Sequence, residues 1–377
     1  MGTILRLLIA VILAAAAGVG LLWLHFGGGD AYAKLAADPS VTESGLETVV
    51  SYSEPIGNVA VSPSGRVFFT IHPEARPDGP RLMEWREGKA VPFPAAEIQA
   101  QILDTPLGLV VDRQDRLWVV DPSHHGMGRP RLVAVSLATG IVVHEHVFPR
   151  HIAPRGSFLQ DLQVDNAGAT IYLADVSFWR NSPALVVYDV ATRVSRRVLE
   201  NHASVRPQDW VIRTAVKEMR FLGGAIPLKP GLDSIALDPG GQWLYFGAMA
   251  HENLFRIPTA ALRDTTLPDR DLLETLQTVG RKPLSDGLSA DLTGNVYITD
   301  VENGAVLRMA PGGQLSTIVR SARVRWPDAL SFGPDGWLYL ADSALPDVLL
   351  KSRGHIEKSG PYHIYRFRPG TVGIPGQ

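Results

Sequence analysis

Three aspartates that occupy the same position of repeated segments are the residues best placed to do chemistry. Asp233 begins DSIALD, Asp286 begins DGLSAD and Asp328 begins DALSFG, each at the start of an apolar strand. Two carboxylates about 4 Å apart repel by about 4 kcal/mol at an effective dielectric of 20. Three of them around a narrow opening therefore favour a metal cation, a shared proton or a basic ligand. Oxygen ligands of this kind suit Ca²⁺ or Mg²⁺.

The same aspartates have a structural alternative. An Asp at the start of a turn often accepts hydrogen bonds from nearby backbone N–H groups and needs no ligand. The sequence does not decide between three capped turns and one shared site. Asp233, Asp286 and Asp328 are therefore candidates both for catalytic residues and for metal ligands, and we assign no cofactor beyond this Ca²⁺ or Mg²⁺ option.

Further candidates come from neighbouring segments. The third repeat carries Gln160 at the position of the three aspartates, followed by Asp161. Loops that follow the second strand of two repeats carry Phe178 and Trp179, which could stack on an aromatic ligand, and Glu302 with Asn303. We expect these residues to bind a small-molecule ligand, under a roof formed by the long insert 201–230.

Six repeats carry these residues. Each has an apolar strand, a turn that usually holds Asp or Gly, and a second strand that bears an aromatic residue. The turn positions recur at a mean spacing of about 54 residues: Ser62, Asp112, Asp165, Asp238, Asp291 and Gly333. A second hairpin completes each unit, and four-stranded units in radial repetition are propeller blades. The pattern predicts an all-β fold, a six-bladed β-propeller over residues 46–377.

The last repeat lacks an outermost strand after Arg368, and the strand-like segment 46–52 precedes the first repeat. We predict that this segment completes the sixth blade and closes the ring, which removes the open sheet edges.

The N-terminus is a targeting segment. An apolar run extends from Leu7 to Phe26, with Arg6 before it, and is long enough to cross a bilayer. Ala31-Tyr32-Ala33 is typical of a signal-peptidase site, whereas the length favours an uncleaved anchor. Both alternatives place the remaining chain outside the cytoplasm. We assign residues 1–33 as signal peptide or anchor helix and residues 34–45 as a linker, with residues 5–26 as the only contact with the membrane.

Composition limits the partners. The 377 residues include 20% charged residues, a net charge of −2 and no cysteine. Without excess positive charge the chain is unsuited to nucleic acid, and without cysteine it has no disulfide or thiolate metal site. We expect a monomer whose partner is a small molecule.

Several stretches resemble the Yellow/major royal jelly protein family. These are LQDLQVDNAGATIYLAD, GLDSIALDPGGQWLYFGAMAHENLFRIPTAALRD, LSDGLSADLTGNVYITDVENGAVLRM and WPDALSFGPDGWLYLADSAL. The resemblance covers roughly residues 107–345. It implies a secreted six-bladed propeller connected with dopachrome-type pigment chemistry, with binding of small aromatic amines, or with nutritive and signalling roles.

A more distant resemblance is to metal-dependent sugar lactonases of the senescence-marker and gluconolactonase type. Those propellers place Glu, Asn, Asn and Asp ligands at the channel mouth, at the repeat position described above. Asp286 matches their Asp, but Asp233 and Gln160 replace the two Asn, and Gly57 stands where Glu is expected.

Three hypotheses follow. The preferred one is an exported propeller that binds a small aromatic or cationic molecule at the channel mouth, with dopachrome-type isomerisation as an associated activity. The alternative is a Ca²⁺- or Mg²⁺-dependent sugar lactonase. The third is a platform for protein interactions, which the fold alone permits.

Overall fold

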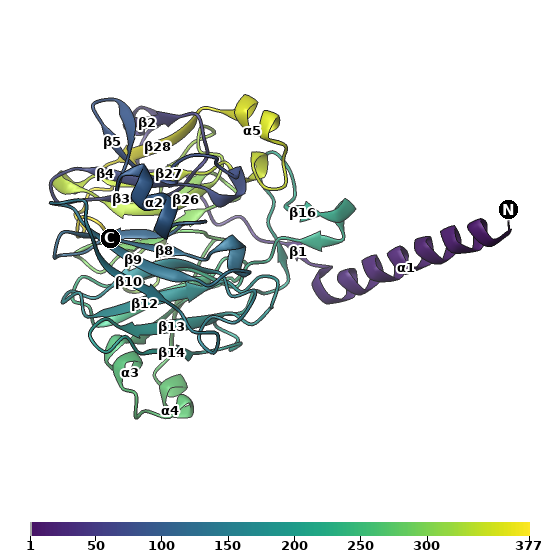
Figure 1. Ribbon diagram of the computed structural model, residues 1–377. Coiled ribbons are helices and arrows are strands. Elements are labelled where there is room, and N and C mark those ends of the chain that lie inside the picture. Colours follow the sequence, from purple (N-terminus) through teal and green to yellow (C-terminus); the bar gives the residue numbers. More distant parts are fainter. Residues whose placement is uncertain (1) are drawn as a thin grey trace.

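Six four-stranded antiparallel sheets surround one axis in the computed structural model, which describes residues 2–377. In five of the sheets the strands run in sequence from the axis outward, and in the sixth the outermost strand comes from the N-terminal part of the chain. Figure 1 shows the stacked sheets from the side. The first three sheets consist of β3 (Ile56–Val61), β4 (Val67–Ile71), β5 (Leu82–Arg86) and β6 (Lys89–Pro92); β7 (Leu109–Val111), β8 (Arg116–Asp121), β9 (Arg131–Ser136) and β10 (Val142–Val147); and β11 (Leu159–Val164), β12 (Thr170–Asp175), β13 (Ala184–Asp189) and β14 (Ser195–Val198).

The other three sheets are given in the same way, from the innermost strand outward. They consist of β18 (Leu232–Leu237), β19 (Trp243–Ala248), β20 (Asn253–Pro258) and β21 (Gln277–Arg281); β22 (Leu288–Ala290), β23 (Val296–Asp300), β24 (Ala305–Met309) and β25 (Leu315–Arg320); and β26 (Pro327–Phe332), β27 (Leu338–Asp342), β28 (Tyr362–Phe367) and β2 (Glu47–Tyr52). The innermost strands of neighbouring sheets contact each other all the way round. The predicted six-bladed propeller is confirmed.

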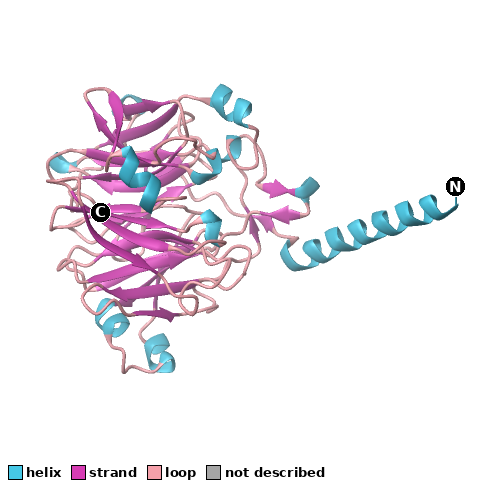
Figure 2. Ribbon diagram, viewed as in Figure 1, coloured by secondary structure: helices cyan, strands magenta, loops and turns pink. Residues whose placement is uncertain are grey.

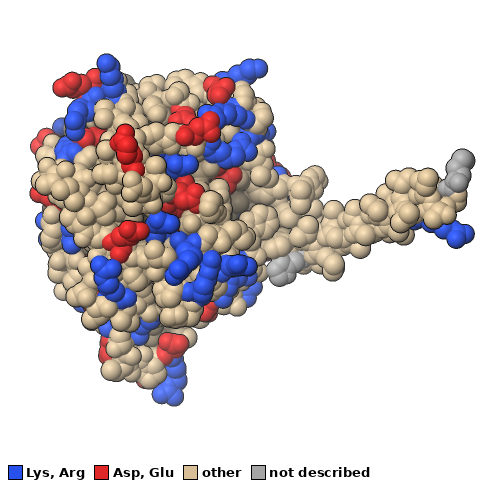
Figure 3. Space-filling view, in the orientation of Figure 1, with Lys and Arg blue, Asp and Glu red and all other residues tan. Residues whose placement is uncertain are grey.

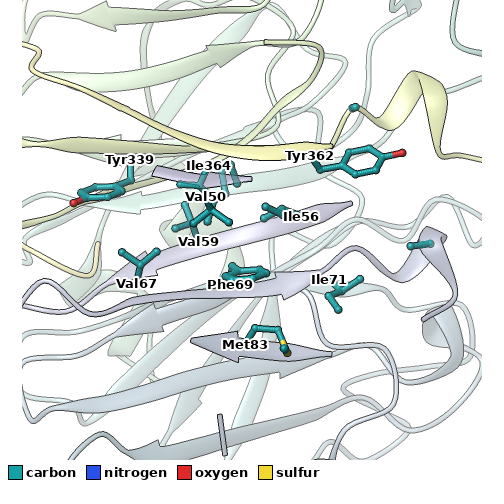
Figure 4. Packing of buried hydrophobic residues seen from close by; sticks show 14 of the residues in the cluster. Val50, Ile56, Val59, Val67, Phe69, Ile71, Met83, Tyr339, Tyr362 and Ile364 are labelled. Carbon is teal, nitrogen blue, oxygen red and sulfur yellow. The ribbon is translucent and has the colours of Figure 1, made fainter. Parts of the chain in front are cut away.

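The N-terminal strand closes the ring, as predicted. β2 pairs antiparallel with β28 and becomes the outermost strand of the sixth blade. Its Val50 is fully buried between the sixth and first blades, next to Ile364 and Val59 (Figure 4). Burying a side chain of this size contributes about 2 kcal/mol, in addition to the backbone hydrogen bonds that cover the edge of β28.

The recurring turn residues have a local function. After the innermost strand of the second blade, Asp112 Oδ1 accepts the backbone N–H groups of Gln114 and Arg116, both at 2.9 Å. Asp291 Oδ1 does the same for Thr293 and Asn295, again at 2.9 Å. An Asp side chain that holds its own turn in this way explains why the residue recurs at these positions.

The remaining elements lie outside the blades (Figure 2). Two small sheets pair β1 (Asp30–Ala31) in parallel with β15 (Trp210–Val211), and β16 (Arg220–Phe221) with β17 (Ile226–Pro227). The helices are α1 (Gly2–Phe26), α2 (Ala96–Ile102), α3 (Thr259–Arg263), α4 (Asp269–Glu274) and α5 (Arg353–Ser359). Helix α1 projects from the propeller on the side of β1 and β16 (Figure 1). Segment 34–45 lies along β25, where Val41 N donates to Ile318 O at 2.8 Å.

The closing strand provides a test of this architecture. A chain that begins at residue 56 lacks β2, so it should unfold at a temperature at least 10 °C lower than a chain that begins at residue 34. Thermal unfolding followed by circular dichroism measures the difference. Equal melting temperatures would show that the ring does not depend on this strand.

Candidate functional site

Four of the five residues named above at the channel-mouth position of the repeat are the extra residue of a β-bulge. In β18, Leu232 pairs with Ala248 and Ser234 with Gly247, which leaves Asp233 without a partner. The same shift in register leaves three more residues without a partner on the neighbouring strand: Asp328 in β26, Gln160 in β11 and Gly57 in β3. A bulge turns a side chain away from the normal alternation of a strand. The repeat therefore positions these side chains by a shared distortion of the backbone.

A small buried cavity lies among the candidate residues. Gln160, Asp161, Asp286 and Asp328 line it, together with apolar residues of the innermost strands. Its volume of about 20 Å³ holds one or two water molecules, since one water needs about 10–15 Å³. The cavity therefore has room for an ion or an ammonium group and is too small for an aromatic ring.

Residues of the C-terminus close the cavity on the side opposite the mouth. Gly376 and Gln377 line it. Gln377 O accepts hydrogen bonds from Phe332 N at 2.8 Å and Ser289 Oγ at 3.0 Å. The channel is therefore filled by the chain itself at this end.

Two of the three aspartates carry buried oxygens without partners. Among residues 2–377, neither Asp233 Oδ1 nor Asp328 Oδ2 has a hydrogen-bond partner. Burial, and then the charge of Asp286, raises the pKa of both carboxyls well above the usual range. The charge of Asp161 acts on both in the same direction. The structure thus brings four carboxylates within electrostatic reach of one another.

Unlike the unpartnered oxygens of Asp233 and Asp328, the carboxyl groups of Asp161 and Asp286 accept hydrogen bonds. Asp161 accepts the backbone N–H groups of Leu162 at 2.9 Å and Ile235 at 3.2 Å. Asp286 Oδ2 accepts the indole N–H of Trp326 at 2.6 Å. Burial nevertheless raises the pKa of each carboxyl to about 7. Both groups therefore change their protonation state near neutral pH.

His72 faces this cluster from the first blade. Its Nδ1 accepts the backbone N–H of Glu74 at 3.2 Å, so the neutral ring carries its proton on Nε2. Nε2 lies 3.9 Å from Asp328 Oδ2. Burial lowers the pKa of His72 to about 4, so the ring is neutral at pH 7 and offers an N–H toward the carboxyl.

Lys282 is the basic group that the sequence analysis missed. Its side chain is fully buried, and Nζ donates to Pro283 O at 3.1 Å and Ser285 Oγ at 2.9 Å. Burial lowers its pKa to about 7, against the opposing charges of Asp233 and Asp300. Its position four residues before Asp286 was the only signal of it in the sequence.

A second group of buried aspartates has a structural function. They end the second strand of four blades and hold the backbone at the mouth: Asp121, Asp175, Asp300 and Asp342. Asp175, for example, accepts Phe158 N at 2.8 Å and Arg197 Nη1 at 2.7 Å. These are the backbone-capping contacts that were the structural alternative for Asp233, Asp286 and Asp328. Within residues 2–377, those three accept no backbone N–H in hydrogen bonds of this kind.

The insert 201–230 covers the mouth, as predicted. A cluster of buried side chains joins Ile212, Met219 and Leu228 of the insert to Trp326, the hydrogen-bond partner of Asp286. Tyr32 from the segment after α1 belongs to the same cluster. This insert and the Tyr32 segment are called the roof below.

Four predicted ligand-binding residues lie away from the cavity. Phe178 and Trp179 pack against each other and against Phe26 at the end of α1. Glu302 Oε1 accepts the backbone N–H of Arg213 at 2.7 Å and so fastens the roof. Asn303 Nδ2 donates to Asp300 Oδ2 at 2.9 Å. Their contacts are therefore with the roof and the blade ends.

The donor set for a divalent metal ion is not assembled in this conformation. Over the described part of the chain, no three Asp, Glu or His side chains converge closely enough to hold an ion. At Gly57, a Cβ would lie 2.6 Å from Leu107 Cδ1 and 3.2 Å from His72 Cα. Leu107 and His72 thus occupy the space that a carboxylate at this position would need.

The carboxyl cluster predicts a specific pH dependence of stability. Folded Asp286 keeps its proton up to about pH 7, whereas an unfolded Asp releases it near 3.8. The stability contributed by this proton is present below about pH 4 and is lost as the pH rises to about 7. Asp286→Asn should therefore melt above the wild type by a few degrees at pH 8, and this gap should shrink toward pH 4.5.

Asp175→Asn is the matched control, because it weakens backbone contacts and should lower the melting temperature at both pH values. If Asp286→Asn also lowered it equally at pH 4.5 and pH 8, Asp286 would be another structural cap.

Comparisons with known proteins agree with this architecture. The model of the family "Major royal jelly protein" matches residues 105–328. Major royal jelly protein 1 of Apis mellifera is 23% identical over 178 residues, which are 44% of this chain and 39% of that protein. The match thus spans about two fifths of that relative's length.

Solved structures share the fold. A gluconolactonase from Xanthomonas campestris superposes with a TM-score of 0.56 and 15% identity, covering 90% of this chain and 98% of that one. A calcium-binding protein, regucalcin, from Agrobacterium tumefaciens gives a TM-score of 0.51 and 15% identity, covering 88% and 96%. At such identities the likeness concerns the fold alone. Because the chain forms six blades and the family model matches more than half of its sequence, the chain belongs to the major royal jelly protein family.

Proposed function

We propose that this chain is an exported propeller that binds a small cation, the ammonium group of an amine, at the buried carboxylates. The observation that carries the proposal is the pair of buried, unpartnered oxygens, Asp233 Oδ1 and Asp328 Oδ2. A buried polar atom without a partner costs about 1–3 kcal/mol, more if it is charged. An ammonium group has three N–H donors that would offset this cost.

The size of the cavity restricts the ligand. About 20 Å³ accommodates the charged head of an amine, while any ring must remain outside, toward the roof. An aromatic amine would therefore need part of the roof to move before its ring could follow. The family resemblance to proteins that bind aromatic amines supports such a ligand class.

Proton transfer is a second candidate function. Asp161 and Asp286 have pKa values of about 7, so each can donate or accept a proton at neutral pH. Isomerisation of a dopachrome-like substrate would use this property once the roof has opened. An assay of dopachrome conversion tests it, and equal rates with the wild type and Asp286→Asn would contradict it.

A Ca²⁺- or Mg²⁺-dependent lactonase receives less support. The likeness to gluconolactonases concerns the fold, and the residues described do not gather three ligands for a divalent ion. Leu107 and His72 fill the place of the Glu that such lactonases carry. Ca²⁺ therefore serves as the comparison ligand in the experiment below.

The proposal is tested by thermal unfolding with methylammonium, 2-phenylethylammonium or Ca²⁺ present. A ligand at 100 times its dissociation constant stabilises the folded protein by about 2.7 kcal/mol, or about 4 °C for a domain of this size. We expect methylammonium to raise the melting temperature, and more so at pH 8 than at pH 5.5, because protons compete for the carboxylates at the lower pH.

Asp233→Asn and Asp328→Asn should abolish the shift. Asp335→Asn is the matched control, since it removes the same charge from an exposed turn at the opposite end of the channel, and it should leave the shift intact. A shift with Ca²⁺ alone would favour the lactonase, and no shift with either amine would refute ammonium binding.

A further inference from the structure

The short segment between α1 and the propeller is part of the folded body. β1 pairs with β15 of the roof, and Asp30 N donates to Asp209 O at 2.9 Å. Tyr32 is buried, and its hydroxyl donates to Lys282 O at 2.8 Å. The Arg281 guanidinium lies 5.1 Å from the centre of the same ring. Removal of residues 1–33 would thus take a side chain out of the roof.

The position of β1 also fixes where α1 leaves the molecule. Three residues separate Phe26, the last of α1, from Asp30, the first of β1. Even fully extended, they place the end of the helix within about 14 Å of the roof. Gly27 O accepts a hydrogen bond from Lys229 Nζ at 3.2 Å. The helix therefore starts directly from the face that carries the mouth.

Helix α1 is suited to a bilayer. Its apolar stretch Gly2–Leu24 has 23 residues, none of the stretch is buried against the protein, and Arg6 is its one charged residue. At 1.5 Å per residue it spans about 34 Å, the thickness of a hydrocarbon core with a small tilt. Figure 1 shows it projecting freely from the body.

The surface around the base of α1 is amphipathic. Leu222 and Val216 of the roof and Leu350 of the β27–β28 loop are 61%, 59% and 68% exposed. Trp179 contacts Phe26, and Trp side chains favour the membrane interface. Two lysines lie near these apolar side chains: burial and the charge of the neighbouring Lys351 lower the pKa of Lys217, while the charge of Asp347 raises it. The surface therefore combines apolar and basic side chains.

Figure 3 shows a group of Lys and Arg side chains on the body near the base of the helix, with acidic side chains elsewhere on the same face. An apolar surface with basic residues matches a lipid surface that contains anionic headgroups.

We propose that α1 is retained in the mature protein and holds the mouth face of the propeller against the bilayer that α1 spans. The tether is too short for the propeller to stand away from the membrane. The roof then lies between the lipid surface and the carboxylates, and a ligand reaches the site along the membrane. This orientation is independent of which ligand the carboxylates bind.

The absence of cysteine from the sequence permits a direct test with single-cysteine variants of the full chain. Val216→Cys, Leu222→Cys and Leu350→Cys place a fluorescent label on the mouth face. Ile141→Cys, Val194→Cys and Leu292→Cys are matched controls, because they lie in hairpin turns at the opposite end of the blades and are 61%, 61% and 54% exposed. Each variant is reconstituted into phosphatidylcholine–phosphatidylglycerol vesicles that contain nitroxide lipids.

We expect the nitroxide lipids to quench the three mouth-face labels at least threefold more than the three controls. Equal quenching of both sets, or none, would overturn the orientation. The mass of the protein purified from membranes of an expressing bacterium tests retention of the helix. An intact N-terminus supports it, and a chain that begins at residue 34 would overturn it.

Discussion

The burial of carboxyl groups around one axis is the constraint to which the surrounding structure responds: Asp233, Asp286 and Asp328 are buried, and Asp161 acts on them from nearby. Without the constraint of the fold, such groups would move apart and become hydrated, because each loses much of its hydration when buried. The ring prevents this, since every innermost strand contacts its two neighbours. The N-terminal strand β2 completes the last blade, and the roof and the C-terminal residues cover the two ends of the channel. The protein instead responds through its protons, with carboxyl pKa values raised toward neutrality.

Buried aspartates of the same chain thus serve two purposes, and backbone geometry separates them. Asp175 ends a regular strand and meets backbone N–H and guanidinium donors. Asp233 stands on a bulge one strand closer to the axis, and its Oδ1 meets none. A site of this kind lowers the stability of the empty protein, as ligand sites commonly do. The cation of the proposed function would recover part of that free energy on binding.

Much of this architecture could be predicted from the sequence because the blades repeat. The spacing of the turn residues predicts six blades, and the extra strand before the first repeat predicts the closure that Val50 makes. The shared register also predicts which side chains meet at the axis. The sequence could not show which aspartates cap the backbone. An Asp that accepts backbone N–H groups and an Asp that lacks partners are the same residue type at similar positions of a repeat.

Contacts between segments far apart in the sequence could not be predicted. The indole of Trp326 on Asp286, His72 opposite Asp328, and the burial of Lys282 depend on how blades and loops meet in space. The volume of the cavity likewise depends on the roof and the last two residues. For the same reason Phe178 and Trp179, predicted as walls of the site from their loop, lie instead beside the end of α1.

The most direct measurement is a pH titration of the aspartate carboxyl carbons by ¹³C NMR, with the wild type compared with Asp286→Asn and Asp161→Asn. We expect at least two carboxyl signals to titrate near pH 7, one of them absent from each variant, because the loss of hydration raises the pKa of Asp161 and of Asp286 to about 7. If every aspartate titrated below pH 5, the carboxylates would be solvated or paired. That result would contradict a cluster of buried carboxyls whose protons are lost only near neutral pH.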